Sequence, residues 1–249
     1  MTSIESAVKV AILDDYQNVA LQMADWSPLA GRATITVFND HLDEPDALAA
    51  RLAPFEVVCV MRERTPLTRG LLERLPRLKL IASTAFRNAS IDLQAARERG
   101  IAVANTGYDS TPTIEMTWAL ILASARHVAA ENASLRSGGW QRRIGNDLKG
   151  KTLGVLGLGN IGGEVARIGH AFGMRVIAWS ENLTAEKATA AGAELVRKEE
   201  LCRQSDFLTI HLVLGRRSRG LVGATELALI KPEHGWSIRR VVPSSTTAP

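Results

Sequence analysis

The stretch that decides the fold is KTLGVLGLGNIGGEVARIGHAFGMRVIAWS, residues 151–180. A short apolar run at 153–156 predicts a buried strand between two glycines. Val165, Ile168 and Phe172 then recur at helical spacing, and 174–179 predicts a second buried strand. The stretch is therefore one β-α-β unit of about 30 residues, with a Gly-x-Gly-x-x-Gly spacing at its first turn.

Each residue of that turn has a physical task in a dinucleotide site. Gly157 takes the tight turn out of the strand, and Gly159 lets the backbone approach a pyrophosphate. Gly162 lets the helix pack on the strand, while the amides of Asn160 and Ile161 point at the phosphates from the positive end of the helix. An ordinary glycine-rich turn is the alternative, but the strand-helix-strand context favours a dinucleotide site.

Composition excludes several classes of protein. With 249 residues, 46% hydrophobic and 22% charged, the chain is typical of a soluble globular protein of one large or two modest domains. A formal charge of +4, spread over short basic clusters, argues against a nucleic-acid partner. The longest apolar run, 116–125, is too short to span a bilayer, and no secretory signal is visible. We expect a cytoplasmic protein with no membrane partner. No His/Cys/Asp cluster has the spacing of a metal site.

The part of the chain before residue 105 predicts a parallel α/β domain. Strands are expected at 8–13, 33–38, 55–61, 78–82 and 101–104, and helices at 43–52, 68–75 and 91–99. This alternation is typical of a parallel sheet covered on both faces.

A single long helix is expected at 112–136, because Pro112 suits a first helical position and glycines follow Ser137. We interpret it as the connector between two lobes. After the β-α-β unit, helices are expected at 184–191, 198–204 and 224–230, and strands at 194–196 and 206–212.

Several segments taken together resemble the D-isomer-specific 2-hydroxyacid dehydrogenase family. They are LKLIAST at 78–84, NASID at 88–92, GIAV at 100–103, NTG at 105–107, TIE at 113–115, GLGNIGG at 157–163, Ser205-Asp206, His211-Leu212 and LALIKP at 227–232. The resemblance implies a flavodoxin-like substrate domain at 1–104 and a Rossmann-type doubly wound NAD(P)-binding domain at 105–232, with a cleft between them. It further implies hydride transfer between a nicotinamide and C2 of a small 2-oxo or 2-hydroxy acid, by a homodimer.

By that resemblance, Thr84, Ala85, Phe86 and Arg87 form the loop that offers backbone amides to the substrate carboxylate. Ala85-Phe86-Arg87 stands where family members usually carry glycine, so the substrate itself is not identified. Arg87 either pairs with a carboxylate or is a solvated loop arginine.

The resemblance also implies the remaining cofactor contacts. Thr113 would lie near the nicotinamide, unless it is only a hydroxyl at a helix start, and His211 and Leu212 would lie near the adenine. After the second strand, Ser180 and Glu181 occupy the position that reads the adenosine ribose. Glu181 either accepts from the 2′-hydroxyl or is a surface carboxylate. NAD is favoured, because no arginine follows for a 2′-phosphate, and NADP is not excluded.

The resemblance implies a reaction centre of three residues: an arginine, a histidine, and a glutamate that raises the pKa of the histidine. All three follow the fourth strand-helix pair of the cofactor domain. Residues 233–249 do not match that region, and their Pro/Ser/Thr-rich end predicts disorder. Residues 234–249 can be encoded by a set of codons that, translated in a different reading frame, gives WLVNTSRGPIVDDGA. This second translation resembles the strand and arginine turn that the family has at this point. We therefore expect a frameshift near Pro232, a truncated cofactor domain, and no assignable catalytic residue.

This chain is accordingly expected to be a weakly stable and inactive member of the family. A second function class is a non-catalytic protein that binds NAD(H) as a signal to a partner. A purely structural α/β protein, the third, predicts no NAD binding at all.

Overall fold

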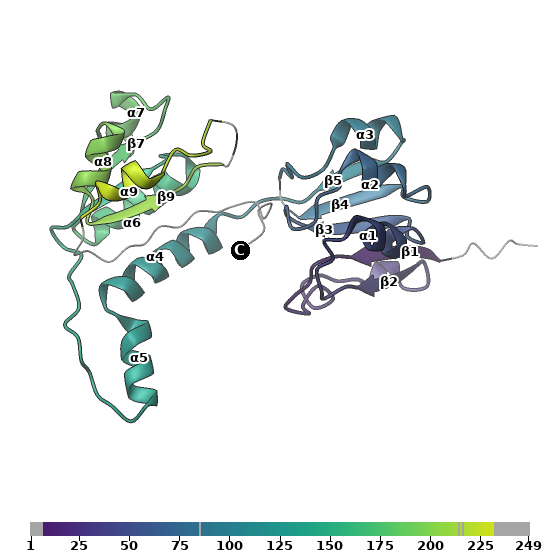
Figure 1. Cartoon of the computed structure of the whole chain (residues 1–249), viewed down its shortest axis with the longest axis horizontal. Coiled ribbons are helices and arrows are strands. Elements are labelled where there is room, and N and C mark those ends of the chain that lie inside the picture. The colour runs from purple at the N-terminus through teal and green to yellow at the C-terminus, as the bar shows by residue number, and fades with distance from the viewer. Residues whose placement is uncertain (1–6, 85, 214, 216, 232–249) are drawn as a thin grey trace, which may run out of the picture. The chain divides into compact units, whose positions relative to one another are not determined.

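The computed structural model describes residues 7–84, 86–213, 215 and 217–231, which form two compact units divided between residues 108 and 109 (Figure 1). The first unit contains β1 (Val8–Ile12), η1 (Ser27–Leu29), β2 (Ala33–Val37), α1 (Pro45–Leu52), β3 (Val57–Met61), α2 (Arg69–Glu73), β4 (Leu80–Thr84), α3 (Leu93–Glu98) and β5 (Ala102–Asn105). The second contains α4 (Thr111–Ala125), α5 (Val128–Arg136), β6 (Thr152–Leu156), α6 (Asn160–Ala171), β7 (Arg175–Trp179), α7 (Ala185–Ala190), β8 (Glu194–Leu195), α8 (Lys198–Gln204), β9 (Phe207–Ile210) and α9 (Ala224–Ala228).

The sheet of the first unit is parallel throughout, in the order β2-β1-β3-β4-β5. This is the flavodoxin-like order 2-1-3-4-5, so the fold expected for this half is confirmed. Its helices begin where side chains cap them: Glu44 accepts from two amides of α1, Thr68 from one of α2, and Asp92 from one of α3.

One face of this sheet packs on all three helices. Val58, Val60 and Ile81 are fully or almost fully buried there, in one cluster with Leu52 of α1 and Leu72 of α2. The alternate side chains of β3 point to the opposite face, and Val57, Cys59 and Met61 are only partly buried. Contrary to expectation, the described residues therefore cover only one face completely. The reason lies in residues 14–32, which connect β1 to β2. This is the one connection that runs toward the β2 edge of the sheet, and it forms turns and η1 in place of an α-helix.

The sheet of the second unit is also parallel, in the order β8-β7-β6-β9. It corresponds to the first four strands of the Rossmann order 3-2-1-4-5-6, as predicted. Trp118 and Ile121 of α4 and Val165 of α6 pack on one face, and Leu201 and Cys202 of α8 pack on the other. Both faces of this sheet are thus covered.

The expected single helix at 112–136 is wrong, because α4 and α5 are separate helices. His127 between them has a left-handed backbone, with φ of 53°, which ends the hydrogen-bond ladder of α4. On one side of α4, Trp118, Ile121 and Ala125 are buried, whereas α5 buries only Ser134. Packing on the sheet therefore ends where the helix breaks, and α4 is part of the second unit's core.

Among the described residues, no helix combines the length and the apolar character needed to cross a bilayer. The residues of the expected tail, 233–249, lie outside the described part of the chain.

Candidate functional site

The turn at Gly157 is built by contacts on both sides. Its φ of 101° lies in the region that favours glycine. A β carbon there would lie 2.7 Å from the carbonyl oxygen of His211 and 2.9 Å from Cδ2 of Leu212. The Gly157 amide donates to the carbonyl of Trp179 at 2.9 Å. The turn is thus held between the carboxyl ends of β7 and β9, and Gly157, His211 and Leu212 are brought together.

The first turn of α6 is open to a ligand. Gly159 is its N-cap and supplies no side chain, so no side chain caps the helix. Asn160 and Ile161 are the first helical residues, and a β carbon on Gly159 would meet no atom within 4 Å. Backbone amides at an uncapped helix start carry partial positive charge, which suits a phosphate.

Gly162 fixes how closely α6 approaches the turn. Its hydrogen side faces the carbonyl oxygen of Gly157 at a distance that leaves no room for a β carbon, and such an atom would lie 3.1 Å from Cγ1 of Val155. Gly162 is buried, whereas Gly163 next to it has open space around its α carbon.

Ser180 is tied to the glycine turn, since its Oγ accepts from the amide of Leu158 at 3.0 Å. Its hydroxyl therefore positions the loop. Glu181 is exposed, and within the described residues its carboxylate forms no ion pair. Of these two residues, Glu181 has the carboxylate that remains available to accept from a ribose hydroxyl.

A small, partly open hollow of about 70 Å³ lies at the carboxyl ends of β6 and β9. Leu156, Ile210 and Leu212 form its apolar wall, with Ser218, Gly220, Leu221 and Val222. His211 donates its amide to Leu156 at 2.8 Å, and its Nε2 lies 2.8 Å from Thr209 Oγ1. The contact of His211 with Leu156 thus places the end of β9 beside this hollow.

Thr113 lies in the first turn of α4 and is half-buried. Its neighbour Ile114 packs on the same apolar cluster as Leu158 and Ile161 of the glycine turn. The backbone carbonyl of Thr113 accepts from Thr117 Oγ1 at 2.7 Å.

The candidate substrate loop lies in the first unit, after β4. Thr84 Oγ1 accepts from the amide of Arg62 at 3.1 Å. Phe86 and Arg87 are exposed, with the Arg87 guanidinium 5.5 Å from the Phe86 ring centroid. Ala85 lies outside the described residues. Asn88 closes the loop, because its Nδ2 donates to the Arg62 carbonyl at 2.5 Å and its Oδ1 accepts from Ser90.

Two further histidines, His127 and His170, also have defined places. His127 forms the break between α4 and α5, within the stretch that was expected to be one helix. His170 is on α6, with Nε2 2.7 Å from the carbonyl of Gly192. In the described part of the chain, no three His, Cys, Asp or Glu side chains gather as a metal site would require.

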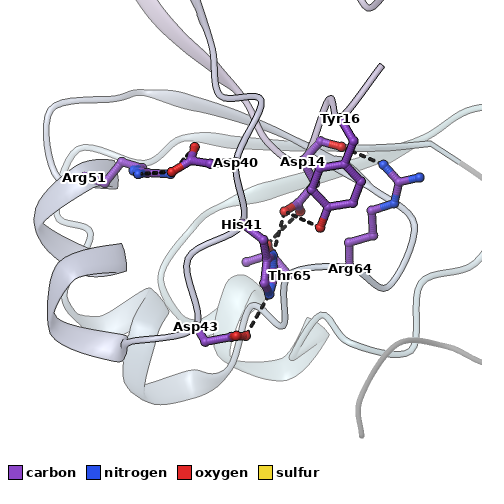
Figure 2. A network of polar contacts seen from close by, with 8 residues as sticks. All are labelled: Asp14, Tyr16, Asp40, His41, Asp43, Arg51, Arg64 and Thr65. Carbon is purple, nitrogen blue, oxygen red and sulfur yellow. Dashed lines mark hydrogen bonds and ion pairs between the residues drawn. The ribbon is translucent and has the colours of Figure 1, made fainter. Parts of the chain in front are cut away.

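Sequence reasoning missed a polar network at the carboxyl end of the first sheet (Figure 2). Asp14 follows β1, His41 follows β2, and Thr65 follows β3, so the three side chains meet at one edge. A signal was present: polar residues directly follow three consecutive predicted strands, and parallel strands end at the same edge.

Comparison with known proteins agrees with this arrangement. Residues 118–235 match the family model of the "D-isomer specific 2-hydroxyacid dehydrogenase, NAD binding domain". The matched segment includes the glycine turn and α6, and NAD is the cofactor of this domain.

Two glyoxylate reductases are among the similar proteins. That of Pyrococcus horikoshii is 31% identical over 235 residues, which cover 90% of this chain and 68% of that protein. That of Aeropyrum pernix is 44% identical over 171 residues, 65% of this chain and 51% of that protein. The chain thus spans about half the length of the latter relative.

A similar solved structure is that of a phosphoglycerate oxidoreductase from Vibrio cholerae. It is 36% identical, with a TM-score of 0.86, and the match covers 93% of this chain and 75% of that one.

Proposed function

The chain belongs to the D-isomer specific 2-hydroxyacid dehydrogenase family, and from this premise we propose that its second unit binds NAD at the glycine turn. The observation that carries the proposal is the contact of Gly162 with the Gly157 carbonyl beneath an uncapped start of α6. The pyrophosphate would lie on the amides of Asn160 and Ile161, the adenine beside His211 and Leu212, and the ribose within reach of Glu181. Thr113 would lie toward the nicotinamide.

The test is a binding titration of the full chain with NADH and with NADPH. We expect heat and a raised melting temperature with NADH, and a weaker response to NADPH, because Glu181 would face the 2′-phosphate. Silence with both nucleotides, measured on folded protein, would contradict the proposal.

We further propose that the first unit, 1–104, binds the substrate and that 105–232 forms the cofactor domain. The substrate would be a small 2-oxo or 2-hydroxy acid, with its carboxylate at the Thr84–Arg87 loop. Support comes from Arg87, whose guanidinium makes no ion pair within the described residues and is exposed. An unpaired arginine beside exposed backbone suits a carboxylate.

The reaction class is hydride transfer, for which the bound nicotinamide supplies the donor or acceptor carbon. We propose that this chain does not turn substrate over, and the sequence of residues 233–249, which does not follow the family's pattern, supports this. The family match ends at residue 235, close to the proposed frameshift. Sequencing the coding DNA tests the frame. NADH oxidation with glyoxylate or hydroxypyruvate tests turnover, and measurable activity would overturn this part.

A homodimer is the proposed assembly. Exposed apolar side chains gather on α4 and α5, namely Met116, Leu120, Leu122, Val128 and Leu135. Such a surface suits a second copy, because hydrophobic patches of this kind mark interfaces. Light scattering after gel filtration is expected to give the mass of a dimer, and Leu120→Glu with Leu135→Glu is expected to give a monomer. We also propose a cytoplasmic location, with both thiols free as in the structure.

A further inference from the structure

The buried carboxylate of Asp14 is the centre of the network in Figure 2. It is 2% exposed and has three side-chain neighbours. Oδ1 lies 2.7 Å from His41 Nδ1, Oδ2 accepts from Thr65 Oγ1 at 2.7 Å, and the Tyr16 hydroxyl lies at 3.5 Å. Arg64 donates to the Asp14 carbonyl at 2.6 Å. Loops that follow β1, β2 and β3 are therefore joined at one residue.

His41 is held by carboxylates at both ring nitrogens. Nε2 lies 2.7 Å from Asp43 Oδ1, in addition to the contact of Nδ1 with Asp14. A doubly protonated imidazolium donates from both ring nitrogens, which fits an acceptor oxygen at each of them. The hydrogen bond to Asp14 raises the pKa of His41, with a further contribution from Asp43, against the opposing effect of burial. Because neither nitrogen is free, His41 is not placed to exchange protons with a substrate.

The same edge carries unusual backbone. Asp14 has a φ of 58° and Arg62 a φ of 53°, both left-handed and neither glycine. Such conformations persist where surrounding contacts hold them. Arg62 is held by the candidate substrate loop: its amide donates to Thr84 Oγ1 at 3.1 Å, and its carbonyl accepts from Asn88 Nδ2. The segment 62–65 therefore connects the Asp14 network to the loop at 84–88.

We propose that the His41 imidazolium is a positioning group that locks the three loops together and thereby orders the substrate loop, and that its deprotonation loosens both. The role of residues 84–88 in binding substrate rests on the function proposed above. The lock itself does not require that function.

The other charged groups around His41 are already engaged. Asp40 pairs with Arg51 of α1 at 2.7 Å, and Glu44 accepts from the first amides of α1. Asp15 accepts from the amides of Val19 and Ala20. From the segment after β3, Arg64 lies 4.6 Å from the Tyr16 ring centroid and Glu63 lies 3.9 Å from Arg62. Asp14 and Asp43 are therefore the carboxylates in direct contact with His41, and Asp40 senses its charge more weakly, after its hydrogen bond with Arg51.

The direction of the pH effect follows from the raised pKa. A group with a raised folded-state pKa contributes stability below its ordinary value, here 6.5, and loses it as the pH rises through the raised value. The opening equilibrium of the loops is therefore expected to shift toward the open state as the pH rises across that range.

Hydrogen exchange of the full chain, without cofactor or substrate, tests the proposal between pH 5.5 and 8.5, after correction for the intrinsic rates. Protection of the amides in 38–44 and of those of residues 84 and 86–88 is expected to fall together, several-fold, as the pH rises. The proposal is overturned if 84–88 does not change, or changes without 38–44. Because no ligand is present, this outcome is independent of whether the chain binds NAD or a 2-oxo acid.

Variants separate the lock from general stability. His41→Gln is expected to give low protection of 84–88 at every pH, whereas His41→Arg, charged throughout, is expected to restore it and to remove the pH dependence. Asp40→Asn breaks the neighbouring ion pair but keeps both contacts of the imidazole, so the fall in protection is expected to remain, with at most a small displacement along the pH axis. A His41→Gln profile equal to wild type would refute the lock, and the wild-type titration decides alone if a variant does not fold.

Discussion

The α carbon of Gly162 lies so close to the carbonyl oxygen of Gly157 that no β carbon fits between them. This contact sets the distance between α6 and the turn that follows β6. The distance in turn decides where the first amides of α6 meet a phosphate.

Gly162→Ala is therefore expected to destabilise the protein by about 1–3 kcal/mol through overpacking and to abolish the melting shift with NADH. Gly163→Ala is the matched control, since its new methyl group meets no atom within 4 Å. It is expected to stabilise α6 by about 0.5–1 kcal/mol and to keep the NADH response. Thermal unfolding with and without NADH measures both. Equal behaviour of the two variants would show that the close contact does not matter.

Thr65→Val tests the buried donor to Asp14. Both side chains are 2% exposed and joined at 2.7 Å, so the variant leaves a buried carboxylate with one donor fewer. We expect a loss of about 1.5–3 kcal/mol in the free energy of unfolding. Thr36→Val on the exposed side of β2 is the control and is expected to be near neutral. Urea unfolding compares them, and a neutral Thr65→Val would mean that Asp14 finds another donor.

Trp118→Phe is expected to change stability by less than about 1 kcal/mol. The Trp118 Nε1 is buried with no acceptor in the described part of the chain, so removing it relieves an unsatisfied donor and offsets the lost ring area. The stacked contact with Phe172, 4.8 Å between ring centroids, is available to either aromatic ring. Trp118→Ala, in contrast, should cost about 3–5 kcal/mol. Unfolding curves that place the two variants together would contradict this account.

The ion pair of Lys198 and Glu226, 2.7 Å apart, predicts acid sensitivity of the second unit. The hydrogen bond from Lys198, followed by that from the Gly223 amide, lowers the pKa of Glu226 to about 2. A carboxylate with a lowered pKa stabilises the folded state at pH values above the ordinary pKa of 4.5. This stabilisation is lost as the pH falls toward 2. Glu226→Gln is expected to make the melting temperature depend less on pH over that range. Glu199→Gln, on the exposed side of α8, is expected to leave the wild-type slope unchanged.

The β-α-β unit was predictable because each of its glycines acts on near neighbours in sequence. Gly157, Gly159 and Gly162 fall where their spacing predicts a strand, a turn and a helix start. The contact of Gly157 with His211 and Leu212 was beyond prediction from spacing alone, since it joins residues far apart in the chain.

The break at His127 shows the limit of periodicity. Neither proline nor glycine marks the position, and helical spacing cannot reveal a single left-handed residue. The place where α4 leaves the core decides it, which is a tertiary effect. The His41 network escaped for a similar reason: Asp14 and Thr65 are separated by 51 positions, and strand order brings them together.

The open side of the first sheet governs how this protein is best handled. Burial raises the pKa of the Cys59 thiol to about 11, so little of it is thiolate at neutral pH. Slow alkylation of that thiol should therefore report each brief uncovering of β3. Two molecules that associate through this incompletely covered face of the sheet would shield it from water, which favours aggregation at high protein concentration. Storage at low protein concentration should therefore slow aggregation, and the alkylation rate of Cys59 measures how often β3 is uncovered.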